Sequence, residues 1–581
     1  MVPGAAVCSR RAASAAADRG IPADSIRSPD MDTQRLILLF IFSFSLLMLW
    51  EAWERESRPK PAAAPRTQQG VPAPAQPAPA PAQKAATPAP AASPGADPAA
   101  QGEVVRVSTD LLIAEIDSLG GTLRKVELVR HKDSRDRSKN FVLLGPEHRY
   151  AAQSGITGDA GPNHRTPWRV LPGERTLAPG AEAVELRLAA PGRDGLQVEK
   201  IYTFKRNSYV IDVSLELRNQ SAAPIATYGY FQLTHDGKPD ADADTIAQQF
   251  GAQSFTGFAV YSEARKFEKV SPSDLDKGKP EHVAQADNGW LAFVQHYFVS
   301  AWLPPQGVAR DYVMEKRQDG TYAGRVLVPA TIAPGTVARL SAPLYAGPQE
   351  QNRLEAAAPG LDLVVDYGFL AIIAWPLFWL LQKFHALSGN WGVAIILLTV
   401  LIKLVFFPLS AASYKSMAKM KLITPRLTKI REMYGQDRQK MNQAMMELYR
   451  TEKINPLGGC FPILVQIPVF IALYWVLLAA IELRQAPFML WIKDLSALDP
   501  YYVLPILMTA TMVVQTKLNP VPPDPVQAQV MKYMPYVFSI FFFFFPAGLV
   551  LYWLVNNILS ILQQWQIQRM FNRDKPAHAK R

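Results

Sequence analysis

The residue most suggestive of chemistry is a lysine inside an apolar run. The run from Ala394 to Ser410 reads AIILLTVLIKLVFFPLS, and Lys403 is its only charged residue. A lysine near the middle of a helix in hydrocarbon costs about 2.5 to 3.5 kcal/mol on insertion scales, so such a residue usually marks a functional site. Its ammonium group donates hydrogen bonds and attracts anions, which predicts a site that receives a negative or polar group.

Two plainer roles for Lys403 stay open. On an ideal helix it lies about 8 Å from Pro408, and a lysine side chain can extend that far to place its ammonium among lipid headgroups. Polar residues in neighbouring spans can also simply join helices. However, several apolar segments carry polar residues, and no Asp or Glu lies near the depth of the lysine to neutralise it. These polar residues, which together predict a wetted groove, are Thr399, Gln466, Thr511, Gln515, Asn556 and Ser560.

The sequence lacks the motifs of most catalytic sites. Its two cysteines, Cys8 and Cys460, have no CxxC or metal-ligand companion, and its eight histidines show no HExxH spacing. It contains no GxxxxGKS/T phosphate loop and no GxSxG elbow. The net charge of +11 comes from basic residues beside apolar segments rather than from a soluble basic patch. We therefore expect no enzymatic activity, no metal, no cofactor and no recognition of specific nucleic-acid sequences.

The elements that position these residues follow three N-terminal segments. Residues 1–30 lack periodicity and Met31 looks like the true start, which indicates a start-site artefact or a disordered extension. Residues 31–56 contain the apolar run Leu36–Trp50 with no small-x-small cleavage site directly after it, which predicts an uncleaved transmembrane anchor. Residues 57–102 contain 12 prolines and are typical of a Pro/Ala-rich linker.

Residues 103–352 alternate in polarity with a period of two. In IDVSLELRN the side chains of Ile211, Val213, Leu215 and Leu217 would face one way and the polar side chains between them the other way. Several further stretches repeat this pattern, with Gly, Asn and Pro between them. Half-buried antiparallel strands of this kind predict an all-β sandwich domain.

Long apolar segments return after Pro359. Residues 353–390 are rich in aromatic residues and predict a helix at the membrane interface. Since about 20 apolar residues cross the hydrocarbon core, we expect membrane spans at residues 391–410, 461–483, 501–516, 533–545 and 547–563. These form a five-span core at residues 391–572, followed by a basic tail at residues 573–581. With the anchor there are six spans, so the expected fold class is a polytopic α-helical membrane protein with an all-β domain.

The distribution of charge predicts the topology. The loop Ala411–Cys460 has ten Lys or Arg against four Asp or Glu, and the tail after Gln568 has five basic residues. The positive-inside rule places this loop and both termini in the cytoplasm. The β domain then lies on the far side of the membrane, which is the periplasm in a bacterial cell.

Within that loop, residues 413–453 predict an antiparallel helical hairpin. Met420, Ile423 and Leu427 recur at steps of three and four residues, and Gly435 should end the first helix. The basic exterior is either a solvated surface or a docking site for the ribosome, anionic lipids or a nascent chain. The candidate docking residues are Lys415, Lys419, Lys421, Arg426, Lys429 and Arg431.

Six long segments resemble the YidC membrane protein insertase family of Gram-negative bacteria. They are MDTQRLILLFIFSFSLLMLW, GWLAFVQHYFVSAWLPP, FFPLSAASYKSMAKMK, NPLGGCFPILVQIPVFIALY, DPYYVLPILM and FPAGLVLYWLVNN, and the resemblance runs from Met31 to about Arg573. It implies a periplasmic β-supersandwich, an interfacial helix, a five-span core around a hydrophilic groove, and cooperation with the Sec translocon.

The resemblance also implies roles for single residues. The groove of the family carries a positive residue at the position of Lys403, most often arginine, and lysine keeps the charge but loses the bidentate fork. A threonine of the groove falls at Thr399 and a polar residue at Gln466, whereas the aromatic residue that contacts the client falls at Trp553, where tyrosine is common. The predicted substrate groove comprises Lys403, Thr399, Gln466, Gln515, Trp553 and Asn556.

The predicted function is that of a membrane protein insertase and chaperone in the bacterial inner membrane. It would insert nascent membrane proteins and help them fold, alone or with the Sec translocon. Two other functions stay open: a small-anion transporter with Lys403 as the anion site, and a membrane-anchored carbohydrate-active envelope protein. A transporter would predict internal repeats, and the sequence shows none.

Overall fold

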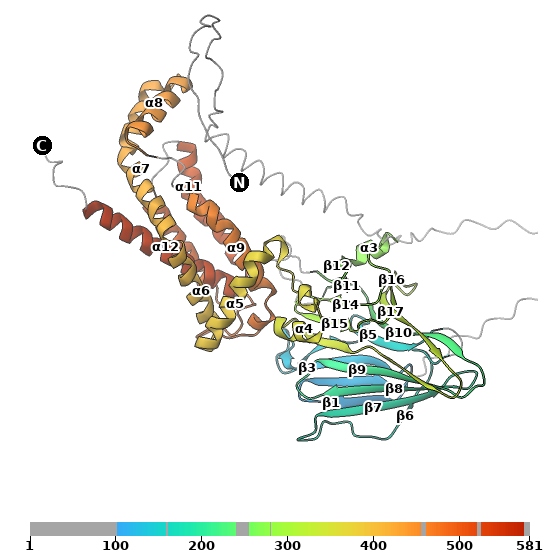
Figure 1. Cartoon of the computed structure of the whole chain (residues 1–581). Helices are drawn as coiled ribbons and strands as arrows, with labels where there is room; N and C mark the ends of the chain where they lie inside the picture. The colour runs from blue at the N-terminus through green and yellow to red at the C-terminus, as the bar shows by residue number, and fades with distance from the viewer. Residues whose placement is uncertain are drawn as a thin grey trace, which may run out of the picture. The chain divides into compact units, whose positions relative to one another are not determined.

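The computed structural model describes residues 102–157, 161–239, 255–278, 280–454, 461–519 and 525–573. The start segment, the anchor, the linker up to residue 101, Cys460 and residues 574–581 of the tail lie outside the described residues. Figure 1 shows strands in the first part of the described chain and long helices in the second part. This order matches the change from period-two alternation to long apolar segments in the sequence.

The described strands form two antiparallel sheets. The first sheet has nine strands in the order β1-β2-β3-β5-β10-β17-β16-β13, with β4 beside β3. Its strands are β1 Val104–Ser108, β2 Leu112–Asp117, β3 Thr122–Lys132, β4 Asn140–Leu144, β5 Ala151–Ile156, β10 Ile225–His235, β13 Gln285–Ala286, β16 Arg310–Lys316 and β17 Tyr322–Ile332. The hairpin β16-β17 lies beside β10, because β17 pairs with β10. These neighbouring strands are distant in sequence.

The second sheet has ten strands within the described residues. Their order is β12-β11-β14-β15-β19-β9-β8-β7-β6, with β18 beside β9. The strands are β6 Arg169–Val170, β7 Ala183–Pro191, β8 Leu196–Lys205, β9 Val210–Asn219, β11 Gly257–Ser262, β12 Lys266–Val270, β14 Trp290–Val294, β15 Phe298–Trp302, β18 Val337–Ser341 and β19 Leu344–Pro348. A short helix, α3 Pro272–Asp276, follows β12.

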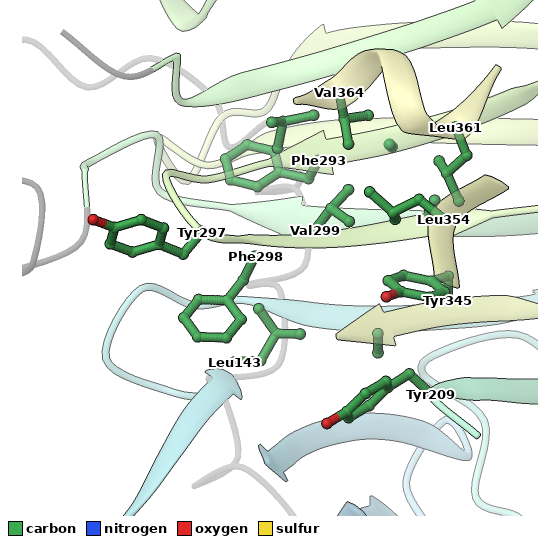
Figure 2. Close-up of a cluster of buried hydrophobic side chains, with 14 of the residues drawn as sticks. Leu143, Tyr209, Phe293, Tyr297, Phe298, Val299, Tyr345, Leu354, Leu361 and Val364 are labelled. Carbon is green, nitrogen blue, oxygen red and sulfur yellow. The ribbon is translucent and has the colours of Figure 1, made fainter. Parts of the chain in front are cut away.

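The core of the sandwich contains the side chains that the alternation predicts. On β9, Ile211, Val213, Leu215 and Leu217 are all fully buried. Figure 2 shows part of this core, where aromatic and branched side chains from several strands meet around Phe298. Burial of such side chains is the main favourable term in folding, so the alternation of apolar and polar residues explains how the two sheets form a common core. The predicted β-sandwich is confirmed.

Helices make up the rest of the described chain. They are α4 Gln351–Ala357, η2 Leu361–Val364, η3 Gly368–Leu370, α5 Ala371–Ser388, α6 Trp391–Val405, α7 Phe407–Tyr434, α8 Arg438–Thr451, α9 Phe461–Ala479, η5 Ile481–Leu483, α10 Val503–Leu518, α11 Pro525–Phe542 and α12 Ala547–Arg573. α11 begins before the predicted span 533–545, and α12 continues beyond the predicted span 547–563. Helices extend past the apolar residues because Gln, Met and Arg also favour helical backbone.

The predicted span 391–410 is not one straight helix. α6 ends at Val405, α7 begins at Phe407, and their axes differ by 65°. Phe406, between them, has φ −88° and ψ 6°, outside the usual helical values. Pro408 has no amide hydrogen, so the Leu404 carbonyl cannot accept the helical hydrogen bond from that position. The proline therefore explains the break at Phe406, three residues after Lys403.

A single helix that crosses a bilayer must be long and apolar. In the described part of the chain, no helix meets this requirement alone, whereas α6 and α7 meet it together as a bent pair. Two shorter apolar stretches, Val465–Ala479 and Val503–Leu518, fall below the required length.

α7 and α8 form the predicted antiparallel hairpin. Gly435 caps α7, and Asp437 caps α8 by accepting hydrogen bonds from two backbone amides. Ile423 and Leu427 of α7 form a small buried cluster with Ile454, which follows α8. The salt bridge from Arg426 to Glu452 joins the same two segments.

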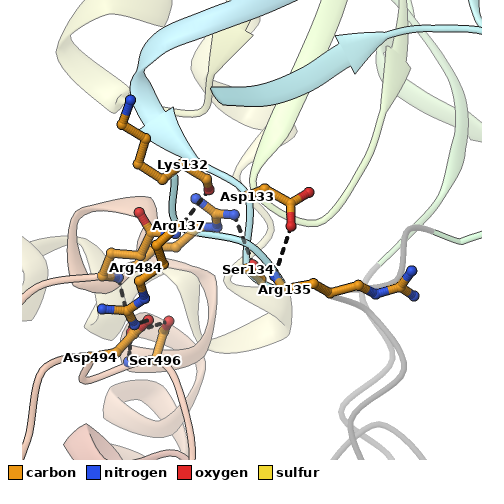
Figure 3. Close-up of polar contacts among 9 residues, drawn as sticks. Lys132, Asp133, Ser134, Arg135, Arg137, Arg484, Asp494 and Ser496 are labelled. Carbon is orange, nitrogen blue, oxygen red and sulfur yellow. Dashed lines mark hydrogen bonds and ion pairs between the residues drawn. The ribbon is translucent and has the colours of Figure 1, made fainter. Parts of the chain in front are cut away.

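The loop between β3 and β4 contacts the segment between α9 and α10. Arg137 donates to an oxygen of Asp494 at 2.9 Å, and Arg484 donates to Ser134 at 2.9 Å. Gln485 donates to the carbonyl oxygen of Lys132 at 2.8 Å. Figure 3 shows Arg137 and Ser134 from the first segment beside Asp494 and Arg484 from the second. The β domain and the helical region are thus joined by polar contacts far apart in sequence.

Candidate functional site

The ammonium group of Lys403 is buried among helices. Its side chain is 5% exposed, and its Nζ donates to the hydroxyl of Ser560 on α12 at 2.7 Å. Among the described residues it forms no salt bridge with a carboxylate. An ammonium group has three N–H donors, so a single hydroxyl leaves two donors for other groups. The lysine therefore faces α12.

Helix α12 carries the polar partners of three other helices. Asn556 accepts a hydrogen bond at 3.1 Å from Gln466 on α9, and Asn557 donates to Thr511 on α10 at 2.9 Å. One turn later, Ser560 binds Lys403, and its own hydroxyl also donates to the Asn556 carbonyl. We call Asn556, Asn557, Ser560, Gln563 and Gln564 the polar ladder of α12. Asn556, Ser560 and Gln563 follow one another at steps of four and three residues, and Asn557 and Gln564 come directly after the first and the last of them, so the ladder runs along one side of α12.

The last steps of the ladder reach the ends of two helices. Gln563 donates to the backbone carbonyl of Lys403 at 3.4 Å, and Gln564 donates at 3.1 Å to the side chain of Asn519 at the end of α10. The ends of α6 and α10 therefore meet the same turn of α12. Gln564 is fully buried, so this polar contact lies inside the helical bundle.

Three other predicted groove residues have different surroundings. The Thr399 hydroxyl is buried and donates to the carbonyl of Ile395 in its own helix at 2.7 Å. Trp553 is buried among aromatic rings and lies parallel to Phe470, with 5.5 Å between the ring centroids. Gln515 is half-buried on α10. The structure thus brings Lys403 and Gln466 into contact with the polar ladder, to which Asn556 belongs. Thr399 instead bonds within its own helix, and Trp553 packs against aromatic rings.

The contacts of the ladder include pairings that the sequence did not predict. Ser560 and Thr511 have polar side chains in apolar segments, but their pairing with Lys403 and Asn557 depends on how the helices pack. Gln563 and Gln564 lie at the end of the apolar run, where a polar residue needs no special explanation. The helical period from Asn556 through Ser560 to Gln563 is the signal that would have found them.

The candidate docking residues lie along α7. The side chains of Lys415, Lys421 and Lys429 are exposed, and that of Lys419 is half-buried. Arg426 is exposed but bonded to Glu452, so part of its charge is compensated within the hairpin. Arg431 is half-buried. The predicted basic exterior is therefore present on the first helix of the hairpin.

One group of side chains in the β domain has the composition of a metal site. His148, His235 and Asp236 each offer an atom within 4.8 Å of the others. However, Nδ1 of His235 accepts a hydrogen bond from the Gly237 amide at 2.9 Å, and burial lowers the pKa of His235 to about 3. The neutral ring then carries its proton on Nε2, which leaves neither nitrogen available to a metal. We assign no metal to these residues.

Comparison with known families identifies the two regions. Residues 104–380 match the model of the YidC periplasmic domain, and residues 383–575 match that of the 60Kd inner membrane protein family. A solved structure described as an active YidC insertase covers 80% of this chain and 94% of its own, with 17% identity and a TM-score of 0.37.

Two curated relatives match along nearly the whole chain, and both are named membrane protein insertase YidC. The relative from Aromatoleum aromaticum is 52% identical over 94% of this chain and 99% of its own length. The relative from Nitrosospira multiformis is 50% identical over 93% of this chain and 97% of its own length. These names support neither an anion transporter nor a carbohydrate-active protein. Identity of this extent shows that the chain belongs to the YidC family of membrane protein insertases.

Proposed function

We propose that this chain inserts proteins into the inner membrane by receiving their polar segments beside Lys403. The observation that carries the proposal is a buried ammonium group whose one described side-chain partner is a neutral hydroxyl, that of Ser560. A carboxylate partner within the protein would have neutralised this charge. The lysine instead stays able to attract an acidic or carbonyl-rich segment of a nascent membrane protein.

The proposed step lowers the cost of moving polar backbone across the bilayer. Hydrocarbon offers no hydrogen bonds to amide groups, so a client tail needs polar surroundings for as much of the path as possible. The ladder of α12 offers amide and hydroxyl groups next to the ammonium group of Lys403. A membrane potential then favours export of each negative charge by about 2.3 kcal/mol per 100 mV. Transfer of the client's apolar helix into lipid completes insertion without a nucleotide.

The topology is part of the proposal. Both termini and the α7–α8 hairpin lie in the cytoplasm, the β domain lies in the periplasm, and the anchor with five further segments gives six spans. The basic excess of the loop Ala411–Cys460 supports this arrangement. The match of residues 104–380 to the YidC periplasmic domain supports the same side for the β domain. Under this topology the client enters from the end of α6 that carries Lys403.

The partners are proposed from the same features. Exposed lysines of α7 would dock the ribosome, anionic lipids or the nascent chain, and the Sec translocon would deliver clients with several spans. Reversal of two exposed charges, Lys415→Glu and Lys429→Glu, is expected to weaken co-sedimentation with ribosomes translating a membrane protein. Lys383→Glu with Lys493→Glu, at two exposed lysines outside the hairpin, provides a charge-matched control.

The decisive experiment reverses the buried charge. Purified Lys403→Glu protein in proteoliposomes should insert a small client with an acidic tail at least tenfold more slowly than the unchanged protein. Lys403→Arg should stay within about twofold, because it keeps the charge. Lys383→Glu makes the same change on an exposed lysine of α5 and should have little effect. Normal insertion by Lys403→Glu would refute capture by this lysine.

A further inference from the structure

A second site with a distinct character lies between α10 and α11. A cavity of about 410 Å³ opens between the last turns of α10 and the first half of α11. Its wall includes Val513, Met531, Pro535 and Tyr536, so most of the lining is apolar. This volume is within the range of small-molecule sites in proteins.

Two lysines supply the charge of this cavity. Lys517 on α10 and Lys532 on α11 both contribute to the lining, and both are exposed. Neither α10 nor α11 contains an Asp or Glu. The lining itself contains no acidic residue. The cavity therefore joins an apolar wall to an electropositive mouth, which suits a ligand that is both anionic and apolar.

Contacts of α12 place the cavity along the bundle. Asn519, which belongs to the lining, accepts a hydrogen bond from Gln564, and the neighbouring Gln563 bonds to the backbone of Lys403. The cavity thus lies at the end of the bundle where α6 continues into the basic hairpin. Under the proposed topology this is the cytoplasmic end, where the membrane leaflet carries anionic lipids.

The outer surface of α11 indicates the medium around the cavity. Val530, Tyr533, Val537 and Ile540 are 49%, 57%, 53% and 61% exposed, respectively. Their spacing of three and four residues places them on one face of the helix, so α11 presents an exposed apolar face. In a membrane protein, an exposed apolar face of this kind contacts lipid. The ligand nearest to the cavity is therefore a lipid of the bilayer.

We propose that this cavity binds one anionic phospholipid of the cytoplasmic leaflet. Its phosphate diester lies between the ammonium groups of Lys517 and Lys532. One acyl chain lies against Val513, Met531 and Pro535. The bound lipid bridges α10 and α11 at the end of the bundle near Lys403. This proposal rests on the proposed topology and not on the proposed capture of clients by Lys403.

Native mass spectrometry of the full-length protein tests this proposal directly. Phosphatidylglycerol and phosphatidylcholine with the same acyl chains are added separately to detergent-solubilised protein, and the retained lipid is counted. We expect phosphatidylglycerol to be retained preferentially. Each lysine near a membrane surface contributes about 1 kcal/mol to anionic lipid binding, so Lys517→Gln with Lys532→Gln should weaken retention about 25-fold. The matched pair Lys383→Gln with Lys493→Gln should retain the lipid normally.

Two further arms separate a lipid from a free phosphate and from the basic hairpin. Val513→Trp fills the apolar part of the cavity without changing charge, and it should weaken retention while circular dichroism stays unchanged. Inorganic phosphate in large excess should not displace the lipid. Equal retention of the two lipids, normal binding by the double lysine variant or by Val513→Trp, or displacement by phosphate would each overturn the proposal. Since insertion is not measured, failure here leaves the role of Lys403 unaffected.

Discussion

At the scale of single residues, the positive charge of Lys403 can be neutralised by a substitution at its partner, Ser560. The two side chains are 2.7 Å apart at Nζ and Oγ. A carboxylate introduced at position 560 would form a buried ion pair and remove the net positive charge. Ser560→Asp should therefore slow insertion of an acidic-tailed client about as much as Lys403→Glu, measured in proteoliposomes. Ser560→Asn, which stays neutral, should keep most activity, and equal loss in both variants would indicate a packing defect instead.

Buried histidines make the β domain sensitive to acid. Burial lowers the pKa of His131 to about 4, and the Arg484 guanidinium contributes to this shift. Between pH 6.5 and 4 the unfolded chain binds a proton that the folded domain does not, so the free energy of unfolding falls as the pH falls. One such residue contributes at most about 1.4 kcal/mol per pH unit. Urea unfolding at pH 7 and pH 5 should show a smaller loss for His131→Gln than for the unchanged protein.

At the scale of elements, the break between α6 and α7 depends on Pro408. Pro408→Ala restores the amide hydrogen that the Leu404 carbonyl requires, which favours a straight helix. Spin labels at Val393 and Leu422 should then move apart, toward the roughly 44 Å of a straight helix at 1.5 Å per residue. Pro425→Ala lies inside α7, where the helix is already continuous, and it should leave the distance unchanged. An unchanged distance in Pro408→Ala would show that packing, not the proline, sets the bend.

The strands and helices were predicted from the sequence more accurately than the contacts between them. The alternation around Ile211 predicted a strand, and Gly435 predicted the end of α7, because both signals are local in the chain. Helix ends were less accurate, since apolar composition reports where a chain meets hydrocarbon and not where its backbone hydrogen bonds stop. α12 continues through Gln563 and Gln564 for this reason.

At the scale of the whole molecule, Arg484 links the two regions of the chain. Its guanidinium group lies 5.2 Å from the ring centroid of Phe141 and 5.5 Å from that of Phe298, and it donates to Ser134. Arg484→Ala should increase hydrogen–deuterium exchange in the loop between β3 and β4, because both the stacking and the hydrogen bond are lost. Lys493→Ala, an exposed residue of the same segment, serves as the control. Equal exchange in both variants would show that the contact does not hold the loop.

The candidate site could be predicted only in part, because it depends on distant segments. Lys403 was evident from its type alone, since a charge inside an apolar run is costly. Its partner Ser560 lies 157 residues away, and no local pattern reports which turn of α12 faces α6. Trp553 packs against aromatic rings of the bundle, and its predicted contact with a client stays a prediction. The packing of the helices therefore determines which of the predicted groove residues contact one another.

The polar ladder has a consequence for how the sequence of α12 can change. Its rungs reach three different helices at successive turns, so their angular phase must be kept along the whole segment. Deleting one residue between Asn557 and Ser560 would rotate everything downstream by about 100°. Lys403 and Asn519 would lose their partners at once while composition and hydropathy stayed almost the same. Point substitutions should thus be tolerated far better here than a single-codon deletion.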